Sequence, residues 1–159
     1  MKSIVLVVGL TLLLIAVPLR SQSLTNTEKA DIEKLLKNQV AQYLSTYEKI
    51  DLQAAIEFWS RDNLIGAIGY GQHYTTIEAV TGYLARQNKG RKEQTIDVQD
   101  VKIRILSPNM AVAQVSYNWR IIAANGNVSN YVVALTEYWV KESSGWKLTF
   151  EAGSSAARQ

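Results

Sequence analysis

The sequence predicts an α+β domain in which a cone-like, curved antiparallel sheet wraps around about three N-terminal helices. Two observations carry this prediction. After residue 23, the first half of the chain repeats apolar residues at intervals of three and four, whereas residues 95–154 alternate as long strands. A helical segment followed by a run of strands is typical of the α+β class. Residues 24–159 are expected to form a single domain, because no long linker or internal repeat divides them.

Residues 1–23 are expected to be a secretory signal peptide and not part of the fold. Lys2 supplies a positive start, and the apolar run Ile4–Val17 is shorter than the roughly 20 residues that span a bilayer. Small residues at Ser21 and Ser23 suit cleavage after Ser23, which would export the domain to the periplasm or the medium. The alternative is an uncleaved segment that anchors the protein. The sequence contains no cysteine, which excludes disulfides and a lipid-modified cysteine.

The charge of the chain without this leader argues against nucleic-acid binding. The whole chain has 17 Lys and Arg against 14 Asp and Glu, but Lys2 and Arg20 belong to the leader, so the remainder carries a net charge of about +1. The short basic cluster at residues 89–92 is typical of a solvated loop. One histidine, no cysteine and no acidic cluster at ligand spacing predict that the protein has no metal site and no cofactor.

Two helices are predicted before residue 60. Thr25 and Glu28 have the spacing of a capping box, and the long helix that follows presents one apolar stripe that reaches Tyr47. Asp51 is suited to cap a second, shorter helix that runs through Trp59. Both helices therefore need a surface on which to bury their apolar sides.

A short strand and a third helix are expected before the main sheet. Leu64–Gly69 is apolar and punctuated by glycine, which predicts a short strand, and Gly69–His73 is expected to be a loop. Thr75 and Glu78 again have capping-box spacing, so they are expected to open a helix that ends between residues 88 and 91.

Four long strands follow. In Thr95–Leu106 the apolar alternation changes parity near residue 99, which predicts a bulge that bends the strand. Residues 111–123 alternate cleanly and place Tyr117 and Trp119 on one buried face. Asn125-Gly126 predicts a hairpin turn, after which residues 128–141 and 146–154 complete an antiparallel meander. One face of the last strand is expected to pack under the helices through Trp146, Leu148 and Phe150.

The chain resembles the small SnoaL-like domains of the nuclear transport factor 2-like superfamily over residues 26–154. Three local features, in this order along the chain, carry the resemblance. They are Tyr43 and Tyr47 followed by Asp51-Leu52, Gly71 followed by Thr76–Val80, and Thr136–Trp139 followed by Gly145–Leu148 and Ser154. Many relatives have a histidine where this chain has Ala152, so an activity that depends on that histidine is not expected here.

The resemblance implies a cone-like fold in which the curved sheet leaves a pocket over the helices. It implies no particular reaction, because the relatives include isomerases, dehydratases, cyclases, ligand binders and interaction modules. Relatives also commonly pair through the outer face of the sheet. Residues 128–140 are apolar on both faces of their strand, so a homodimer that buries this outer face is expected.

Glu137 and His73 are the candidates for a catalytic proton acceptor. Glu137 lies in an apolar strand: facing a pocket, it would have a raised pKa, and facing outward, it would pair with Lys147 or Arg120. The alternation leaves both orientations open, and a structural role is favoured. His73 is the only histidine and is expected near the pocket rim, where a local hydrogen bond is favoured over a role as general base.

An aromatic pocket is expected between the first helix and the concave face of the sheet, entered near residues 69–73. Tyr43 and Tyr47 lie one helical turn apart, so both rings share one face of that helix. Trp59 from the second helix and Trp119 from the sheet are expected to meet them. The expected ligand-binding residues are Tyr43, Tyr47, Trp59, Tyr70, His73 and Trp119.

These observations favour a non-catalytic, exported domain that binds a small, mostly apolar ligand. The first alternative is a proton-transfer enzyme of the isomerase or dehydratase type, with Glu137 or His73 as the base. The second alternative is a protein-interaction or dimerisation module that uses the outer face of the sheet. No nucleic-acid partner is expected, and membrane contact is expected only through an uncleaved leader.

Overall fold

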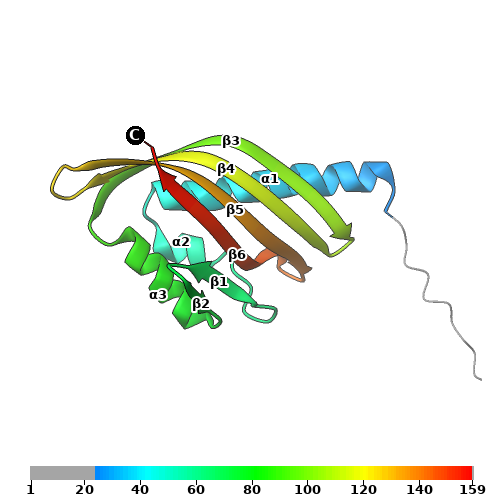
Figure 1. Ribbon diagram of the computed structural model, residues 1–159. Coiled ribbons are helices and arrows are strands. Elements are labelled where there is room, and N and C mark those ends of the chain that lie inside the picture. Colours follow the sequence, from blue (N-terminus) through cyan, green and yellow to red (C-terminus); the bar gives the residue numbers. More distant parts are fainter. Residues whose placement is uncertain (1–23, 159) are drawn as a thin grey trace, which may run out of the picture.

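The computed structural model describes residues 24–158, which form three helices and one six-stranded sheet (Figure 1). In chain order the elements are α1 (Asn26–Glu48), α2 (Leu52–Ile56), β1 (Gly66–Gly69), β2 (Gln72–Tyr74), α3 (Ile77–Asn88), β3 (Arg91–Ser107), β4 (Met110–Ala123), β5 (Val128–Glu142) and β6 (Gly145–Ala157). The signal peptide expected at residues 1–23 lies outside the described residues. From residue 24 to residue 158, no helix is both long enough and apolar enough to cross a membrane.

The sheet is mixed but mostly antiparallel, with the strand order β2-β1-β6-β5-β4-β3. Strands β3 to β6 form the predicted meander, and β1 joins the edge of β6 in parallel. Figure 1 shows the long strands curving over α1, with α2, α3 and the β1–β2 hairpin under the lower part of the sheet. The predicted α+β class, with a curved sheet around three helices, is confirmed.

Two of the predicted helix starts are confirmed by their caps. The Thr25 hydroxyl accepts a hydrogen bond from the Glu28 amide at 3.2 Å, and the Glu28 carboxylate accepts one from the Thr25 amide at 2.8 Å. Asp51 caps α2 through the amide of Ala54 at 3.0 Å. The prediction that this helix runs through Trp59 is wrong, because α2 ends at Ile56 and Trp59 forms a bridge to strand β6.

The segment between residues 69 and 76 differs from the prediction in two ways. Residues 69–73 are not a loop: Tyr70 and Gly71 make a tight turn at positive φ, and His73 lies in β2, paired with Ile68 of β1. The third helix is capped by Thr76 and not Thr75, because the Thr76 hydroxyl accepts the amide hydrogen of Ala79 at 3.2 Å. Two consecutive threonines give this cap two possible registers in the sequence.

The register of the sheet shifts at several positions, and two of these β-bulges bear on the predictions. The register of β3 against β4 shifts between Val98 and Asp100, which confirms the predicted bulge. A second bulge lies in β6, where Thr149 is an extra residue relative to β5. It reverses the parity of the strand, so Phe150 leaves the face that Trp146 and Leu148 share, and the expectation for Phe150 is wrong. The residue that turns inward instead is Glu151, which is 5% exposed.

The core fills the space between α1 and the inner faces of β4, β5 and β6. Each large apolar side chain that is fully buried here stabilises the fold by about 1.5–3 kcal/mol. The contributors from α1 share one stripe, as the helical spacing predicts, and meet the alternating inward residues of the strands. They include Leu36, Val40, Tyr43 and Leu44 from α1, and Ala113, Val115, Tyr117, Trp139 and Leu148 from the sheet.

Candidate functional site

A pocket with a volume of about 140 Å³ lies between α1, α3, the end of β1 and the inner faces of β4, β5 and β6. Aromatic side chains make much of its wall: Tyr47, Tyr70, Tyr83, Tyr117 and Trp119. Tyr70, in the β1–β2 turn, is 70% exposed, so the mouth of the pocket lies beside this turn. The deeper wall is closed by residues that are almost completely buried.

One carboxyl group, that of Glu151, lines this pocket. Its Oε2 accepts a hydrogen bond from the Tyr43 hydroxyl at 3.0 Å, and the Tyr43 and Tyr47 hydroxyls are 2.9 Å apart. Tyr43 is fully buried behind the pocket, whereas Tyr47 reaches its wall. The two tyrosines therefore connect the pocket to Glu151 through a chain of hydrogen bonds, in addition to the direct exposure of Glu151.

A second carboxyl group, that of Glu137, lies directly beside the first. Glu137 of β5 and Glu151 of β6 are opposite each other in the register, so their side chains project from the same face of the sheet. Small residues flank the pair on both sides, Ala113 on β4 and Ala67 on β1. Glu137 is completely buried, and its Oε2 accepts the indole N–H of Trp139 at 2.9 Å. Its Oε1 has no hydrogen-bond partner among residues 24–158.

Both carboxyl groups bind protons more tightly than ordinary glutamates do. Burial raises the pKa of Glu137, the neighbouring charge of Glu151 raises it further, and the bond from Trp139 opposes the change. Burial also raises the pKa of Glu151, against the opposing effect of the Tyr43 hydroxyl. Burial likewise raises the pKa values of Tyr43 and Tyr47, so their hydroxyls remain neutral. The site can thus accept or donate hydrogen bonds near neutral pH without carrying two negative charges.

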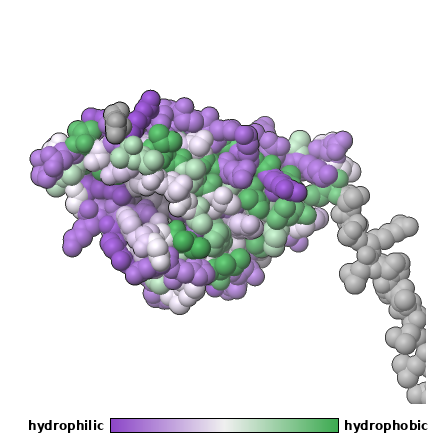
Figure 2. Space-filling model, in the orientation of Figure 1, coloured by the Kyte–Doolittle hydropathy of each residue, from purple (hydrophilic) through white to green (hydrophobic). Residues whose placement is uncertain are grey.

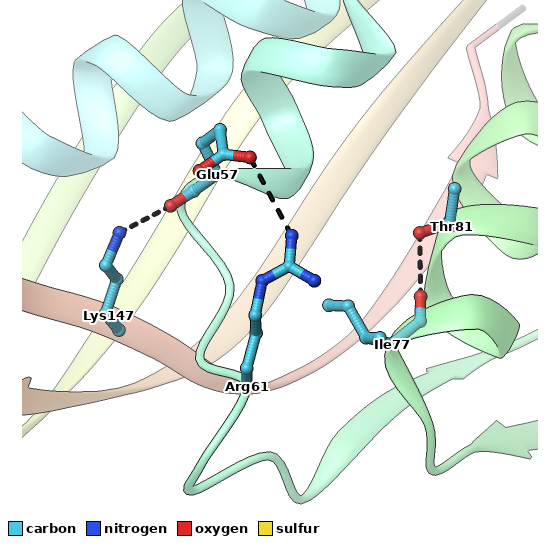
Figure 3. Close-up of polar contacts among 5 residues, drawn as sticks. All are labelled: Glu57, Arg61, Ile77, Thr81 and Lys147. Carbon is cyan, nitrogen blue, oxygen red and sulfur yellow. Dashed lines mark hydrogen bonds and ion pairs between the residues drawn. The ribbon is translucent and has the colours of Figure 1, made fainter.

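The basic residues proposed as partners of an outward-facing Glu137 lie elsewhere. Lys147 donates a hydrogen bond from Nζ to the carbonyl oxygen of Glu57 at 2.7 Å, just after α2, and Glu57 also faces Arg61 at 3.8 Å (Figure 3). Arg120 is exposed. The structure therefore resolves the orientation that the alternation left open: Glu137 faces inward.

Comparison with known proteins assigns the chain to a family. The model of the SnoaL-like domain matches residues 36–158. The chain belongs to the SnoaL-like domain family. This membership confirms the resemblance seen in the sequence and places the protein in the nuclear transport factor 2-like superfamily. No curated protein sequence matches the chain significantly.

Solved structures resemble this SnoaL-like domain in fold at low sequence identity. A nuclear transport factor 2-like superfamily protein from Salmonella enterica is 18% identical, with a TM-score of 0.69 over 86% of this chain and 96% of that one. A proposed dehydratase from Streptomyces avermitilis is 13% identical, with a TM-score of 0.71 over 81% and 98%. A hexachlorocyclohexane dehydrochlorinase from Novosphingobium barchaimii is 10% identical, with a TM-score of 0.71 over 84% and 93%. At these identities the likeness shows the fold alone.

The pocket of this SnoaL-like domain brings together three of the residues expected to bind ligand: Tyr47, Tyr70 and Trp119. The other three do not line it. Tyr43 lies behind the wall, bonded to Glu151. Trp59 is buried, its backbone lies alongside β6, and its indole N–H has no partner among the described residues.

His73 also lies outside the pocket. It is exposed on the edge strand β2, where its Nε2 is 3.2 Å from the carbonyl oxygen of Ile65. Neither candidate base lines the pocket. Glu137 lies next to the pocket residue Glu151, whereas His73 is on β2, which β1 separates from Glu151 on β6. The local hydrogen bond favoured for His73 is present.

The sequence did not point to Glu151, Tyr83 and Gln87 as pocket residues of this domain. The bulge at Thr149 turns the Glu151 side chain inward, and the alternation of residues in the strand does not predict this bulge. Tyr83 and Gln87 are one turn apart on α3, which is a usable signal for a shared face. That signal does not show which face of α3 meets the pocket.

Proposed function

We propose that this SnoaL-like domain binds a small, planar, mostly apolar ligand that carries one or two hydrogen-bonding groups. The observation that supports this most strongly is the combination of aromatic walls, Tyr47, Tyr117 and Trp119, with a single carboxyl group, Glu151. Ligand sites are typically apolar concavities with a few convergent polar groups that fix orientation. Here the rings provide flat contact area, and Glu151 provides the polar contact.

The size of the pocket restricts the ligand to about one six-membered ring. Its volume of about 140 Å³ is close to the roughly 150 Å³ of an engineered protein cavity that holds benzene. A fused polycyclic ligand would require the walls to move. Phenol therefore has the size and the polarity that the pocket fits: its ring would lie among the aromatic residues, and its hydroxyl would donate to Glu151.

Binding of phenol is tested by titration of the ¹⁵N-labelled protein, observed by NMR. The indole N–H of Trp119 and the amides of Gly153 and Ser154, all at the pocket, are expected to shift together. Tyr47→Phe removes one hydroxyl from the wall and with it a hydrogen bond in the chain that leads through Tyr43 to Glu151, so binding is expected to weaken about threefold to tenfold. Tyr138→Phe, on the outer face, is the matched control and should bind as the wild type does. The absence of pocket shifts at millimolar phenol would contradict the proposal.

Proton transfer is the second candidate function, and one observation favours it. Glu151 is a pocket carboxyl group whose pKa is raised by burial to about 7, which suits a general base near neutral pH. Two structural neighbours are named as a proposed dehydratase and a dehydrochlorinase, and loss of water or of hydrogen chloride includes the removal of a proton. We infer that an enzyme built on this pocket would use Glu151, with Tyr47 and Tyr117 orienting the substrate.

The exchange of α-protons of cyclohexanone in D₂O tests this second function. A protein that removes such protons should accelerate the exchange, and Glu151→Gln should abolish the acceleration because an amide cannot accept the proton. Glu142→Gln changes a carboxyl group outside the pocket and serves as the control. Exchange at the rate of buffer alone would contradict the proposed proton-transfer activity and leave the proposed binding function in place.

We also propose that the domain acts after export, as a homodimer that buries the outer face of its sheet. Val132 is 47% exposed on this face, and Figure 2 shows apolar surface between polar margins over the strands. Light scattering should report a dimer that Val132→Lys converts to a monomer. Leu35→Lys, at an equally exposed site on α1, should leave the dimer intact. A monomeric wild type would contradict the dimer.

The proposed export is tested by determining the N-terminal residue of the mature protein. An N-terminus other than Leu24 would contradict the proposed cleavage after Ser23.

A further inference from the structure

Arg91 does not itself line the pocket, but it lies beside the lining residue Trp119. Along β4, Trp119 is several positions away from Ala113, the residue opposite Glu137, so Arg91 and the glutamates lie toward different ends of the sheet. Arg91 follows directly after α3, and its guanidinium group lies 4.2 Å from the centre of the Trp119 ring. Gln94 holds both side chains in place: its Oε1 accepts Arg91 Nη1 at 2.9 Å and Trp119 Nε1 at 3.0 Å. Gln94 is 4% exposed, and its own amide group donates to the carbonyl oxygen of Tyr47. The guanidinium group is therefore fixed in direction.

No carboxylate neutralises this guanidinium group among residues 24–158. The ion pairs in that range are Lys37–Glu33, Arg61–Glu57 and Lys102–Asp100. The other hydrogen bond of Arg91 goes to the amide oxygen of Asn88 at 3.5 Å, so Nε and Nη2 donate to none of these residues. Arg91 is half-buried, and this burial lowers the pKa of its guanidinium group. A partly desolvated cation without a counter-ion is costly, and an anion placed beside it recovers that cost.

The surroundings of Arg91 are those of the pocket. Trp119, on which it stacks, lines the pocket, and so does Gln87, which precedes it at the end of α3. Gln94, which bonds to Arg91, also donates to the carbonyl oxygen of Tyr47, another pocket residue. Arg91 covers one face of the Trp119 ring, so a ligand ring that contacts Trp119 in the pocket would have Arg91 as a neighbour, with Nε and Nη2 free to bond to a substituent.

We propose that the ligand is a small aromatic or alicyclic acid, with its carboxylate on Arg91, its ring against Trp119 and its other polar group directed toward Glu151. This inference rests on the proposed binding function and names the class of ligand. A carboxylate suits this position because its two oxygens match the planar fork that Nε and Nη2 present. The two buried glutamates do not exclude an anion in this arrangement, since the acid group would lie next to Trp119, away from Glu137 along β4.

Calorimetric titration with 4-hydroxybenzoate and 4-hydroxybenzamide tests the proposal. The two probes share the ring and the hydroxyl and differ only in the charge at the other end. Because hydrogen bonds to charged groups are the stronger ones, 4-hydroxybenzoate is expected to bind about tenfold to hundredfold more tightly. Arg91→Gln should remove this preference while leaving the affinity for 4-hydroxybenzamide within about twofold, which shows that the pocket is intact.

Two further variants separate the effects. Arg91→Lys keeps a charge without the fork and should retain a smaller preference for 4-hydroxybenzoate. Arg104→Gln removes an exposed arginine of the same strand and should bind both probes as the wild type does. Equal affinity of the wild type for the two probes would overturn the assignment of an acid and leave the binding function standing. Failure of both probes and of phenol to bind at millimolar concentration would overturn the binding function itself.

Discussion

Replacing Glu137 by Gln is expected to stabilise the protein at high pH and to matter little at low pH. Glutamine has nearly the shape of a protonated glutamic acid, and it can still accept the indole N–H of Trp139. Glu137 is completely buried, and its Oε1 has no partner among the residues the structure describes. Its ionised form is therefore destabilised by burial and by the neighbouring Glu151.

The magnitude and its sign follow from the pKa. Burial, with a smaller contribution from Glu151, raises the pKa of Glu137 from 4.5 to about 8, and each pKa unit corresponds to about 1.4 kcal/mol. Between these two pKa values the folded protein holds a proton that the unfolded chain has lost, so the stability of the wild type falls as the pH rises. The loss reaches about 5 kcal/mol as an upper limit above pH 8, and Glu137→Gln does not suffer it.

Urea unfolding followed by circular dichroism at about pH 5, 7 and 9 measures this difference. The free energy of unfolding of Glu137→Gln should exceed that of the wild type by an amount that grows with pH. Glu142→Gln is the control, and its change in the free energy of unfolding should have the opposite sign. Hydrogen bonds from Ser60 and Asn63 lower the pKa of Glu142, so its ionised form stabilises the folded protein and the substitution should destabilise it. A stability difference between Glu137→Gln and the wild type that stays constant from acid to alkaline pH would refute the reasoning.

Two further substitutions test contacts at the pocket. Tyr43→Phe removes the hydroxyl that donates to Glu151. It should raise the pKa of Glu151 further, which ¹³C NMR titration would measure, and destabilise the fold by about 1–3 kcal/mol. An unchanged pKa of Glu151 would contradict the hydrogen bond. Gly69→Ala would place a methyl group 2.4 Å from the ring of Tyr83, so the melting temperature should fall by the equivalent of about 1–3 kcal/mol. Gly82→Ala, on α3 with open space around it, is the matched control and should stabilise the helix by up to about 1 kcal/mol. Equal effects of the two substitutions on the melting temperature would contradict the close packing of Gly69 against Tyr83.

The sequence predicted the elements whose signals are local. Thr25 with Glu28, and Asp51, bond to amides only three residues away, so their spacing alone identifies the caps. Asn125-Gly126 is a turn, with Gly126 at positive φ, and the change of parity near residue 99 is the bulge of β3. In each case the chemistry that decides the structure lies within a few residues of sequence.

The predictions that failed depend on partners far away in the chain. His73 is in a strand because β1 pairs with it, and β1 in turn is held by β6, some 80 residues later. Trp59 leaves the helix because the backbone beside it bonds to Leu148. Neither pairing has a signal in the local sequence.

The candidate site was only half predictable for the same reason. The aromatic wall follows from alternation and helical spacing, and Tyr47 and Trp119 were found that way. The inward position of Glu151 does not follow from alternation, because the bulge at Thr149 reverses which residues of β6 face inward. Both faces of β5 are apolar, so only the three-dimensional structure shows Glu137 beside Glu151.

A crystal structure of the protein grown with phenol tests the central claim most directly. The proposed binding function predicts electron density for one ring between Tyr47 and Trp119, with its hydroxyl within hydrogen-bond distance of Glu151. The pocket residues should keep their positions, because a site of this kind is largely formed before the ligand arrives. Density for phenol only on the outer surface, with the pocket closed by the side chains of Tyr47 and Tyr117, would contradict it.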